Sequence, residues 1–296
     1  MTVSLERRKQ RVAWIFLGPA LVLIGLFFVL PILAGLLLSF TDFDLYAIGA
    51  PRTARFVGLS NYGSLLGSAE FWQALRNTLY FVVVGGPLTV AVSLGAALLL
   101  NLPRIKLRGL FRTIYFAPVV TTLVAVAIVW RYLYHPHYGI LNYLLGQIGL
   151  GPIDWLGNPA WAMPAIILLA IWKGFGYNML IFVAGLQSIP DELYEAAAVD
   201  GANAWRRFLG VTLPGLAPVS LFVAVTTMIG YFQLFAEPYV MTQGGPLGAT
   251  RSLVLLMYEE GFRWWRLGMA AAMAVLLLII TLGATLIQLR LQGGRR

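Results

Sequence analysis

Four carboxylates gather in one short polar segment near the middle of an otherwise apolar chain. The segment begins at Asp191 and Glu192 and continues through Glu195 to Asp200. Carboxylates at this spacing can form charge-assisted hydrogen bonds with arginine or lysine side chains of a second surface. No grouping of nucleophile, acid and base, and no set of metal ligands, is visible in the sequence. The chemistry that these residues indicate is therefore recognition of a partner and not catalysis.

The residues around the carboxylates predict a short helix. Ser188 is placed to act as its N-cap, and Pro190 suits the first helical turn. Gly201 can adopt the left-handed conformation that ends a helix. A second short helix is expected at 202–210, before Pro214 leads into the next apolar run. Helices this short do not persist alone in water, so this one must dock on something.

The surface of this helix favours a protein partner over lipid. Helical spacing places Leu193, Ala196 and Ala197 on one face, and small alanine side chains allow another protein to approach closely. A helix lying on a membrane would be expected to carry large apolar residues and a basic face. This helix is acidic and rich in alanine, so docking is the favoured interpretation.

The rest of the chain has the composition of a membrane protein. Its 296 residues are 59% hydrophobic and only 11% charged, whereas about 25% of residues are charged in soluble domains. The net charge of +9 comes from basic clusters between apolar runs, so it does not indicate nucleic-acid binding. The chain has no cysteine, and its two histidines, His135 and His137, make a poor metal site alone.

Six apolar segments are long enough to cross a bilayer, which takes about 20 residues. We expect an all-α integral membrane protein with a single transmembrane domain over residues 1–296. The first segment is too long for the apolar region of a signal peptide and is expected to be retained. The expected spans are 12–40, 73–101, 110–133, 161–187, 215–236 and 267–288, with a polar loop at 188–214 between the fourth and the fifth.

Basic residues predict the orientation of these spans. Clusters of Lys and Arg precede the first span, separate spans 2 and 3, separate spans 4 and 5, and close the chain. With six spans, all four clusters fall on one side, which the positive-inside rule identifies as the cytoplasm. Both termini and the polar loop are then cytoplasmic. The clusters consist of Arg7, Arg8, Lys9 and Arg11; Arg104, Lys106, Arg108 and Arg112; Arg206 and Arg207; and Arg290, Arg295 and Arg296.

Polar and aromatic residues about halfway along spans 4 and 5 are candidates for a transport pathway. Polar groups are costly in a bilayer, so their presence there suggests function. Span 5 repeats such residues with the spacing of one helix face, and aromatic rings with neutral hydrogen-bonding groups suit a sugar. The candidates are Trp172, Lys173, Gly174 and Tyr177 in span 4, and Thr227, Gly230, Tyr231 and Leu234 in span 5.

Three of these candidates also have a structural interpretation. Lys173 could face an anionic substrate, but an ammonium group that binds backbone carbonyls or a neighbouring helix is the favoured alternative. Tyr177 and Tyr231 could equally serve helix packing.

The polar loop resembles a known signature. Glu195-Ala196-Ala197, then Gly201, then Val211 and Leu213-Pro214 match the spacing found in binding-protein-dependent permeases of ABC importers. Three further segments, 186–190, 242–246 and 268–272, look like the carbohydrate branch of that family, the maltose- and glycerol-3-phosphate-type permeases.

The resemblance implies a type I ABC importer permease fold and a set of partners. The loop would be a coupling helix held in a cleft of an ATPase subunit. Two such subunits would carry the ATP and magnesium, and this chain would carry no cofactor. A second, different permease chain and an extracytoplasmic solute-binding protein would complete the complex in the cytoplasmic membrane of a bacterium or archaeon. The coupling residues would be Asp191, Glu192, Glu195, Ala196, Ala197, Asp200, Gly201 and Pro214.

The resemblance also supports the candidate pathway. In maltose-type permeases, the positions that match the eight candidates line the sugar site. Tyr231 and Leu234 depart from that pattern, which has asparagine there, so maltose is not the expected cargo unless the partner permease holds it.

Rival functions are disfavoured by what the sequence lacks. No Gly-x-x-x-x-Gly-Lys-Ser/Thr phosphate loop occurs, so ATP hydrolysis is expected on another chain. No Asp or Glu lies inside the six spans, which argues against an ion-coupled secondary transporter. A membrane enzyme would need a catalytic grouping, and an assembly protein would not explain the acidic helix. The favoured function is import of a sugar or oligosaccharide, with glycerol 3-phosphate or a related polyol phosphate as the alternative cargo.

Overall fold

The computed structural model describes residues 2–50, 54–102 and 105–293. The described chain is helical nearly throughout, and its one β-bridge joins Thr41 to Phe56. Four helices are long and apolar enough to cross a membrane, and two bent helix pairs raise the number to six if each pair is one span. The side chains of Arg7, Arg8, Arg11, Arg104, Arg295 and Arg296, which helped to predict the orientation, lie outside the described residues.

The chain divides into two compact units, Met1–Ser68 with Met257–Leu278 and Ala69–Leu256 with Ile279–Arg296. In the first unit, a continuous span at Val12–Leu38 matches the first expected span. It comprises α1 (Thr2–Ile24), a π-helical segment (Gly25–Val29) and α2 (Leu30–Leu38), followed by α3 (Leu45–Gly49) and α4 (Ser60–Leu66).

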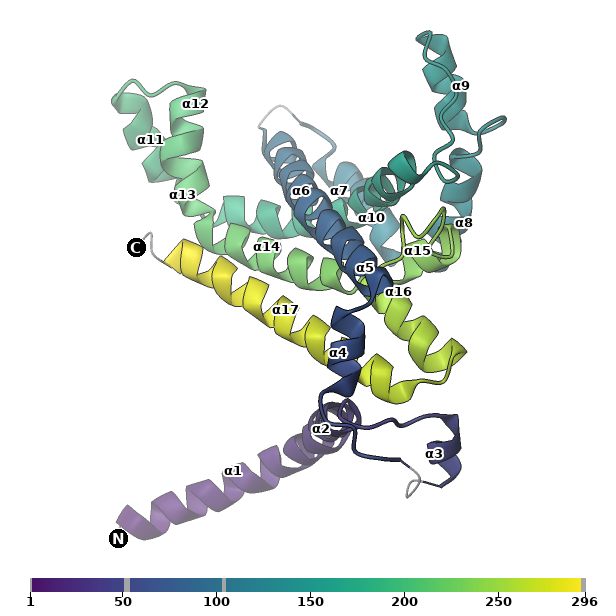
Figure 1. Cartoon of the computed structure of the whole chain (residues 1–296). Helices are drawn as coiled ribbons and strands as arrows, with labels where there is room; N and C mark the ends of the chain where they lie inside the picture. The colour runs from purple at the N-terminus through teal and green to yellow at the C-terminus, as the bar shows by residue number, and fades with distance from the viewer. Residues whose placement is uncertain (1, 51–53, 103–104, 294–296) are drawn as a thin grey trace. The chain divides into compact units, whose positions relative to one another are not determined.

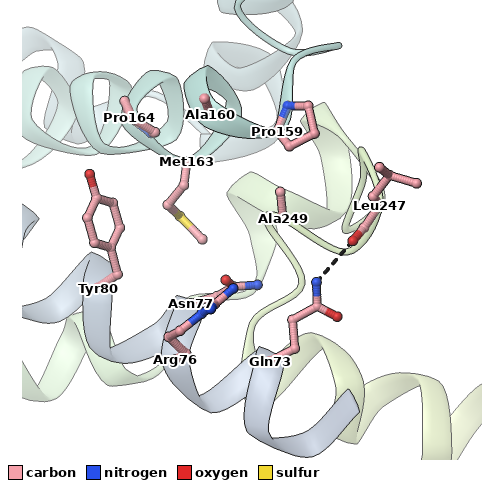
Figure 2. Close-up of a pocket in the computed structure, with 10 residues that line it drawn as sticks. All are labelled: Gln73, Arg76, Asn77, Tyr80, Pro159, Ala160, Met163, Pro164, Leu247 and Ala249. Carbon is pink, nitrogen blue, oxygen red and sulfur yellow. Dashed lines mark hydrogen bonds between the residues drawn. The ribbon is translucent and has the colours of Figure 1, made fainter. Parts of the chain in front are cut away.

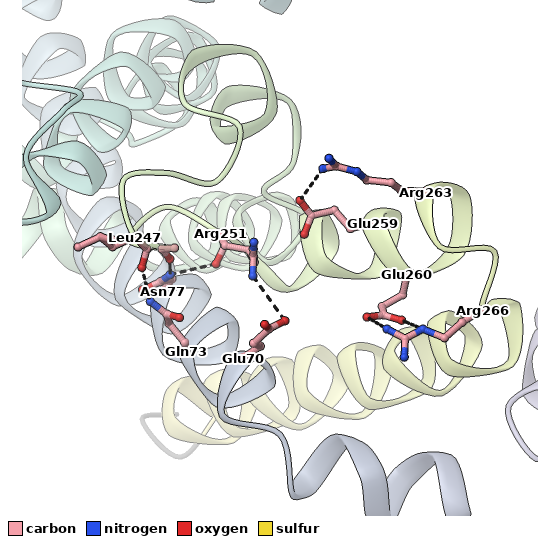
Figure 3. A network of polar contacts seen from close by, with 10 residues as sticks. Glu70, Gln73, Asn77, Leu247, Arg251, Glu259, Glu260, Arg263 and Arg266 are labelled. Atoms are coloured by element: carbon pink, nitrogen blue, oxygen red, sulfur yellow. Dashed lines mark hydrogen bonds and ion pairs between the residues drawn. The ribbon is translucent and has the colours of Figure 1, made fainter.

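The start of the last span is fastened within this first unit. The amide of Gly268 donates to the carbonyl of Phe43 at 2.9 Å. A Cβ at Gly268 would overlap the carbonyl oxygen of Thr41, so only glycine fits this approach. Arg266 forms a two-pronged ion pair with Glu260, with both contacts at 2.6 Å (Figure 3). A bidentate pair of this kind fixes both side chains in one geometry.

The second unit is built around one central helix, α10 (Pro159–Gln187), which packs against α6, α7 and α14 (Figure 1). Its buried side chains belong to two apolar clusters, one containing Ile166 and Leu169 and the other containing Met179 and Phe182. The other elements are α5 (Ala69–Tyr80), a π-helical segment (Phe81–Gly85), α6 (Gly86–Asn101), α7 (Arg108–Val120), α8 (Leu123–Leu133), α9 (Ile140–Gln147), α11 (Asp191–Val199), α12 (Ala204–Arg207), α13 (Leu213–Gly215), α14 (Ala217–Phe232), α15 (Ala236–Met241) and α16 (Leu253–Tyr258). The last span, α17 (Leu267–Gly293), begins in the first unit and ends in the second.

The second, fourth and sixth expected spans are each a single stretch of helix. The third and the fifth are bent. The stretches Ala69–Asn101, Pro159–Gln187 and Leu267–Leu291 match spans 2, 4 and 6. The third span breaks into α7 and α8, which meet at 100°. Thr121 and Thr122 take extended backbone conformations at the break, three residues after Pro118. The third expected span, 110–133, therefore consists of two helices with a sharp bend between them.

The fifth span is also bent, by 66°, between the helical stretch Ala204–Gly215 and α14. Proline lies at the start of the helix on each side of Leu216, as Pro214 in α13 and Pro218 in α14. Proline is tolerated in a first helical turn, where its missing N–H has no partner to lose. The polar loop therefore continues into the span without an intervening coil.

Candidate functional site

The acidic helix exists, but its start differs from the expectation. α11 begins at Asp191, and Pro190 precedes it in an extended conformation with no side-chain cap. Ser188 ends α10 instead, and its hydroxyl donates to the carbonyl of Gly185 at 2.8 Å. The predictions of Ser188 as the N-cap and of Pro190 in the first turn are thus wrong, because the long helix before them uses the serine hydroxyl.

The end of α11 follows the prediction. Gly201 has a φ of +74°, which is the left-handed region that glycine adopts at little cost. Its amide donates to the carbonyl of Ala198 at 3.0 Å, and the amide of Ala202 donates to that of Ala197 at 2.9 Å. This pair of hydrogen bonds is the Schellman motif, which satisfies carbonyls that a helix end would leave unpaired.

The second helix of the loop is longer than expected. Asn203 is its N-cap, with its side-chain oxygen accepting from the amide of Arg206 at 2.9 Å. The side chain of Arg207 donates to the carbonyl of Ala202 at 2.9 Å and fixes the turn between the two helices. The chain then stays helical from Ala204 to Gly215, through a π-helical segment at Phe208–Thr212, and does not stop at residue 210.

A hydrogen bond that the sequence did not reveal ties α11 to this second helix. The hydroxyls of Tyr194 and Thr212 lie 3.0 Å apart. Tyr194 and Val211 pack against an apolar cluster that includes Ile189 and Leu216. The polar loop is thus anchored to buried side chains of the spans.

The outer surface of α11 is acidic and open. Asp191, Glu192, Glu195 and Asp200 are exposed, and in the part of the chain that the structure describes none of them is ion-paired. Ala196 is exposed too, but Ala197 is half-buried, because it lies one turn after Tyr194 on the anchored side. Val199, which is 89% exposed, replaces Ala197 on the exposed apolar face of the helix. The exposed apolar face is therefore Leu193, Ala196 and Val199, in place of the expected Leu193, Ala196 and Ala197.

The candidates in span 5 contact other spans of the same chain. The hydroxyl of Thr227 accepts from the amide of Asn178 at 2.9 Å and joins α14 to α10. The hydroxyls of Tyr231 and Thr89 form a hydrogen bond that joins α14 to α6. Leu234 is only 3% exposed, whereas Gly230 is exposed. These contacts agree with the packing interpretation of Tyr231, and a role in the pathway stays a prediction.

Lys173 contacts the break in the third span. Its ammonium group donates to the carbonyls of Pro118 at 3.0 Å and Thr121 at 2.9 Å. Both carbonyls lie at the C-terminal end of α7, where the helix dipole favours a cation. This is the structural interpretation that the sequence favoured. Glu237 of α15 lies close enough to interact with the ammonium charge.

The remaining candidates of span 4 differ in exposure. Trp172 is 40% exposed, with its ring 5.5 Å from that of Trp130 between centroids. Tyr177 is 51% exposed, and Gly174 is half-buried near Thr89. An aromatic ring with an exposed face and an exposed phenol is compatible with a sugar contact, which stays a prediction.

A polar hollow at the expected outer ends of α5 and α10 was not predicted. Gln73, Arg76, Asn77 and Tyr80 lie on one face of α5 and line a cavity of about 350 Å³ together with residues of α10 and the loop 247–249 (Figure 2). Only the charge of Arg76 inside an expected span could have signalled it.

The loop beside this hollow is held by side chains of α5. Gln73 donates to the carbonyl of Leu247 at 3.0 Å, and Asn77 donates to those of Gly248 at 2.8 Å and Arg251 at 3.0 Å (Figure 3). Arg251 also lies 3.5 Å from a carboxylate oxygen of Glu70. The buried amide of Asn77 and the half-buried amide of Gln73 together satisfy three carbonyls and hold this segment against α5.

Comparison with known families agrees with the fold and the loop. Residues 88–296 match the family described as the binding-protein-dependent transport system inner membrane component. The match covers more than half of the chain, and it includes the polar loop with its anchoring contacts. The chain therefore belongs to this family of membrane subunits of ABC transporters.

Individual relatives match over most of their length. The lactose transport system permease protein LacF of Rhizobium radiobacter is 41% identical over 265 residues, which are 88% of this chain and 87% of the relative. The arabinooligosaccharides permease protein AraP of Bacillus subtilis is 36% identical over 97% of this chain and 90% of its own. The trehalose/maltose permease protein MalF of Thermococcus litoralis is 34% identical over 100% of this chain and 98% of its own.

A solved structure shares the fold. The crystal structure of a bacterial ABC transporter involved in the import of the acidic polysaccharide alginate contains a chain that superimposes with a TM-score of 0.81. The identity is 22%, and the match covers 100% of this chain and 99% of that chain. The type I ABC importer permease fold expected from the sequence is confirmed.

Proposed function

We propose that this chain is a transmembrane permease subunit of an ATP-driven importer, and that its cargo is a sugar or oligosaccharide delivered by an extracytoplasmic binding protein. The observation that supports this most directly is the exposed acidic helix α11, whose carboxylates face outward while Tyr194 anchors it to the spans. The names of the relatives support a carbohydrate cargo, because lactose, arabinooligosaccharides and trehalose or maltose are all sugars.

The mechanism assigned to the loop is the transfer of rigid-body motion. Two ATPase subunits, which carry the ATP and magnesium, would hold α11 in a cleft on the cytoplasmic side. Glu195 and Asp200 would pair with basic side chains there, and Leu193, Ala196 and Val199 would fill the apolar part of the contact. Closure of the two subunits on ATP would move α11, and its anchor to Thr212 would carry the motion into α14.

The rest of the complex follows from alternating access. A second permease chain would supply the other half of the pathway. The binding protein would dock on the loops opposite α11, and the membrane would be the cytoplasmic membrane of a bacterium or archaeon. A related solved structure contains a periplasmic protein with a bound alginate pentasaccharide, which supports a binding-protein partner for this fold.

The first test is a charge reversal on α11. Glu195→Lys should abolish transport and cargo-stimulated ATP hydrolysis while the chain still inserts, because the new ammonium group would face basic side chains across the interface. Glu195→Gln, which removes the charge without reversing it, should give a smaller loss. Full coupling in the Glu195→Lys variant, in membranes that contain normal amounts of the chain, would contradict the docking of this helix on an ATPase.

The second test identifies the cargo. The assembled importer, purified with its binding protein, is offered lactose, maltose, trehalose, arabinooligosaccharides and glycerol 3-phosphate in separate assays of ATP hydrolysis. Stimulation by one of the sugars alone is the expected result. Stimulation by glycerol 3-phosphate and by none of the sugars would replace the carbohydrate cargo with a polyol phosphate.

A further inference from the structure

Two hollows of opposite character meet at the same residues of α5. The polar cavity of about 350 Å³ described above includes Arg76 and Tyr80 in its wall (Figure 2). A second hollow of about 370 Å³ shares these two residues. The rest of its lining is apolar and follows α5 into the π-helical segment, as Trp72, Leu75, Leu79, Val83 and Val84. A molecule that fits both hollows must have a polar end and an apolar end.

The charge at the meeting point is positive and uncompensated. Arg76 is exposed, and within the described residues its guanidinium group has no carboxylate partner and makes no hydrogen bond. No acidic residue lines either hollow. The amide groups of Gln73 and Asn77 already donate to loop carbonyls. Arg76 and the hydroxyl of Tyr80 remain as donors at the point where the hollows meet, together with the second N–H of Gln73, and they suit an anionic oxygen acceptor.

The length of the span places Arg76 at the depth of lipid headgroups. The helical stretch Ala69–Asn101 has 33 residues and is about 50 Å long, whereas the hydrocarbon core is about 30 Å thick. If the excess is shared equally, about seven residues project at each end, and the hydrocarbon begins close to Arg76. The part of the apolar hollow at Leu79, Val83 and Val84 then lies at acyl-chain depth, while Trp72 and the guanidinium of Arg76 lie at the depth of the headgroups.

We propose that Arg76 and the apolar groove below it form a binding site for an anionic phospholipid of the outer leaflet. The phosphate accepts from the guanidinium fork of Arg76 and from the hydroxyl of Tyr80, and one acyl chain lies along Leu75, Leu79 and Val83. An arginine that merely extends its side chain to the interface attracts anionic headgroups by charge alone, whatever the shape of the surface beside it. The proposed site predicts a selectivity for anionic lipid that depends both on Arg76 and on the open groove at Leu79.

Quenching of tryptophan fluorescence tests this site, because Trp72 lines the groove. The assembled importer is reconstituted in nanodiscs of phosphatidylcholine that contain about a tenth of a lipid with brominated chains, either phosphatidylglycerol or phosphatidylcholine. The difference between the natural chain and Trp72→Phe gives the signal of Trp72 alone. We expect brominated phosphatidylglycerol to quench this signal about fivefold more effectively than brominated phosphatidylcholine.

Three variants separate the site from a general attraction to lipid. Arg76→Gln should remove the preference for phosphatidylglycerol, and Leu79→Phe should reduce it by filling the groove while the charge stays. Arg131→Gln, at an exposed arginine of α8 outside the groove, should leave it unchanged. Equal quenching by the two lipids in the natural chain, or an unchanged preference in Arg76→Gln, would overturn the proposal.

A soluble competitor distinguishes a lipid from a small anion or cargo group. Millimolar glycerol 3-phosphate, which has the headgroup charge but no acyl chain, should leave the quenching unchanged. Complete relief of quenching by this competitor would show that the groove contributes nothing, and the lipid site would be wrong.

Discussion

At the scale of single residues, Lys173 shows how one side chain can stabilise an irregular membrane helix. A break in a span leaves backbone carbonyls without partners, which is expensive where water is absent. The ammonium group of Lys173 lies between the carbonyls of Pro118 and Thr121, at 3.0 and 2.9 Å. The carbonyl of Pro118 also accepts from the hydroxyl of Thr121, so the cost of a cation at this depth is offset chiefly by pairing the carbonyl of Thr121.

We predict that Lys173→Met destabilises the assembled importer and lowers uptake whatever the charge of the cargo. The variant leaves the carbonyl of Thr121 without its partner, at a cost of about 1–3 kcal/mol, whereas the carbonyl of Pro118 still accepts from the hydroxyl of Thr121 at 2.6 Å. Thermal unfolding of the purified complex, followed with and without cargo, measures the effect. An unchanged unfolding temperature together with a loss of affinity for cargo would assign Lys173 to the pathway instead.

A second residue-scale prediction concerns the turn after the acidic helix. Gly201→Ala should weaken coupling between transport and ATP hydrolysis, because a left-handed residue with a Cβ costs about 1–2 kcal/mol. Gly210→Ala is the matched control, since a Cβ at either glycine would meet no atom within 4 Å and only Gly201 has a positive φ. Cargo-stimulated ATP hydrolysis of the two purified variants compares them. Equal activity of both would show that the conformation of Gly201 does not matter to coupling.

At the scale of elements, close approaches of helices decide how the spans pack. A Cβ at Gly176 of α10 would overlap the carbonyl oxygen of Tyr115 in α7. Two residues earlier, a Cβ at Gly174 would lie 3.9 Å from Thr89, which is ordinary contact. Small residues at helix contacts are the usual basis of close packing in membranes. Gly176 is such a contact between α10 and α7, whereas the position of Gly174 has room for a methyl group.

We predict that Gly176→Ala prevents normal assembly of the importer and that Gly174→Ala does not. The added methyl group at Gly176 must push α7 away, and the carbonyls of Pro118 and Thr121 would then move off Lys173. Size-exclusion chromatography of the two variants in detergent, at matched expression, reports assembly. A fully assembled Gly176→Ala complex would mean that α7 shifts without penalty.

The sequence predicted the elements better than their contacts. Hydropathy located the spans because the insertion of a segment into lipid depends on its composition. The end of α11 at Gly201 was predicted because it depends only on neighbouring residues. The break at Thr121 was not located because hydropathy reports the composition of a segment and not the direction of its helix axis. The hydrogen bond from Tyr194 to Thr212 was missed because it joins residues 18 positions apart, and no local pattern signals it. Tyr231 and Thr227 follow one helix face, but spacing alone cannot say which neighbour that face meets.

At the scale of the whole molecule, the acidic helix and the outer hollow are expected at opposite ends of the same spans. The end with the acidic helix would receive motion from a partner ATPase. The end with the outer hollow would contact lipid, cargo and the binding protein. This orientation of the spans rests on the positive-inside distribution of Lys and Arg. The orientation is a prediction that can be tested directly.

The absence of cysteine makes that test simple, because the natural chain already provides an unreactive background. Val199→Cys places a thiol on α11, where the side chain is 89% exposed, and Tyr138→Cys places one in the loop before α9, where it is 66% exposed. In cells that express the chain without ATPase subunits, a membrane-impermeant maleimide should label the Tyr138→Cys variant while the cytoplasmic membrane is intact. It should label the Val199→Cys variant only after that membrane is permeabilised. Labelling of Val199→Cys in intact cells would place α11 outside, where no ATPase subunit could bind it, and the proposed coupling would fail with it.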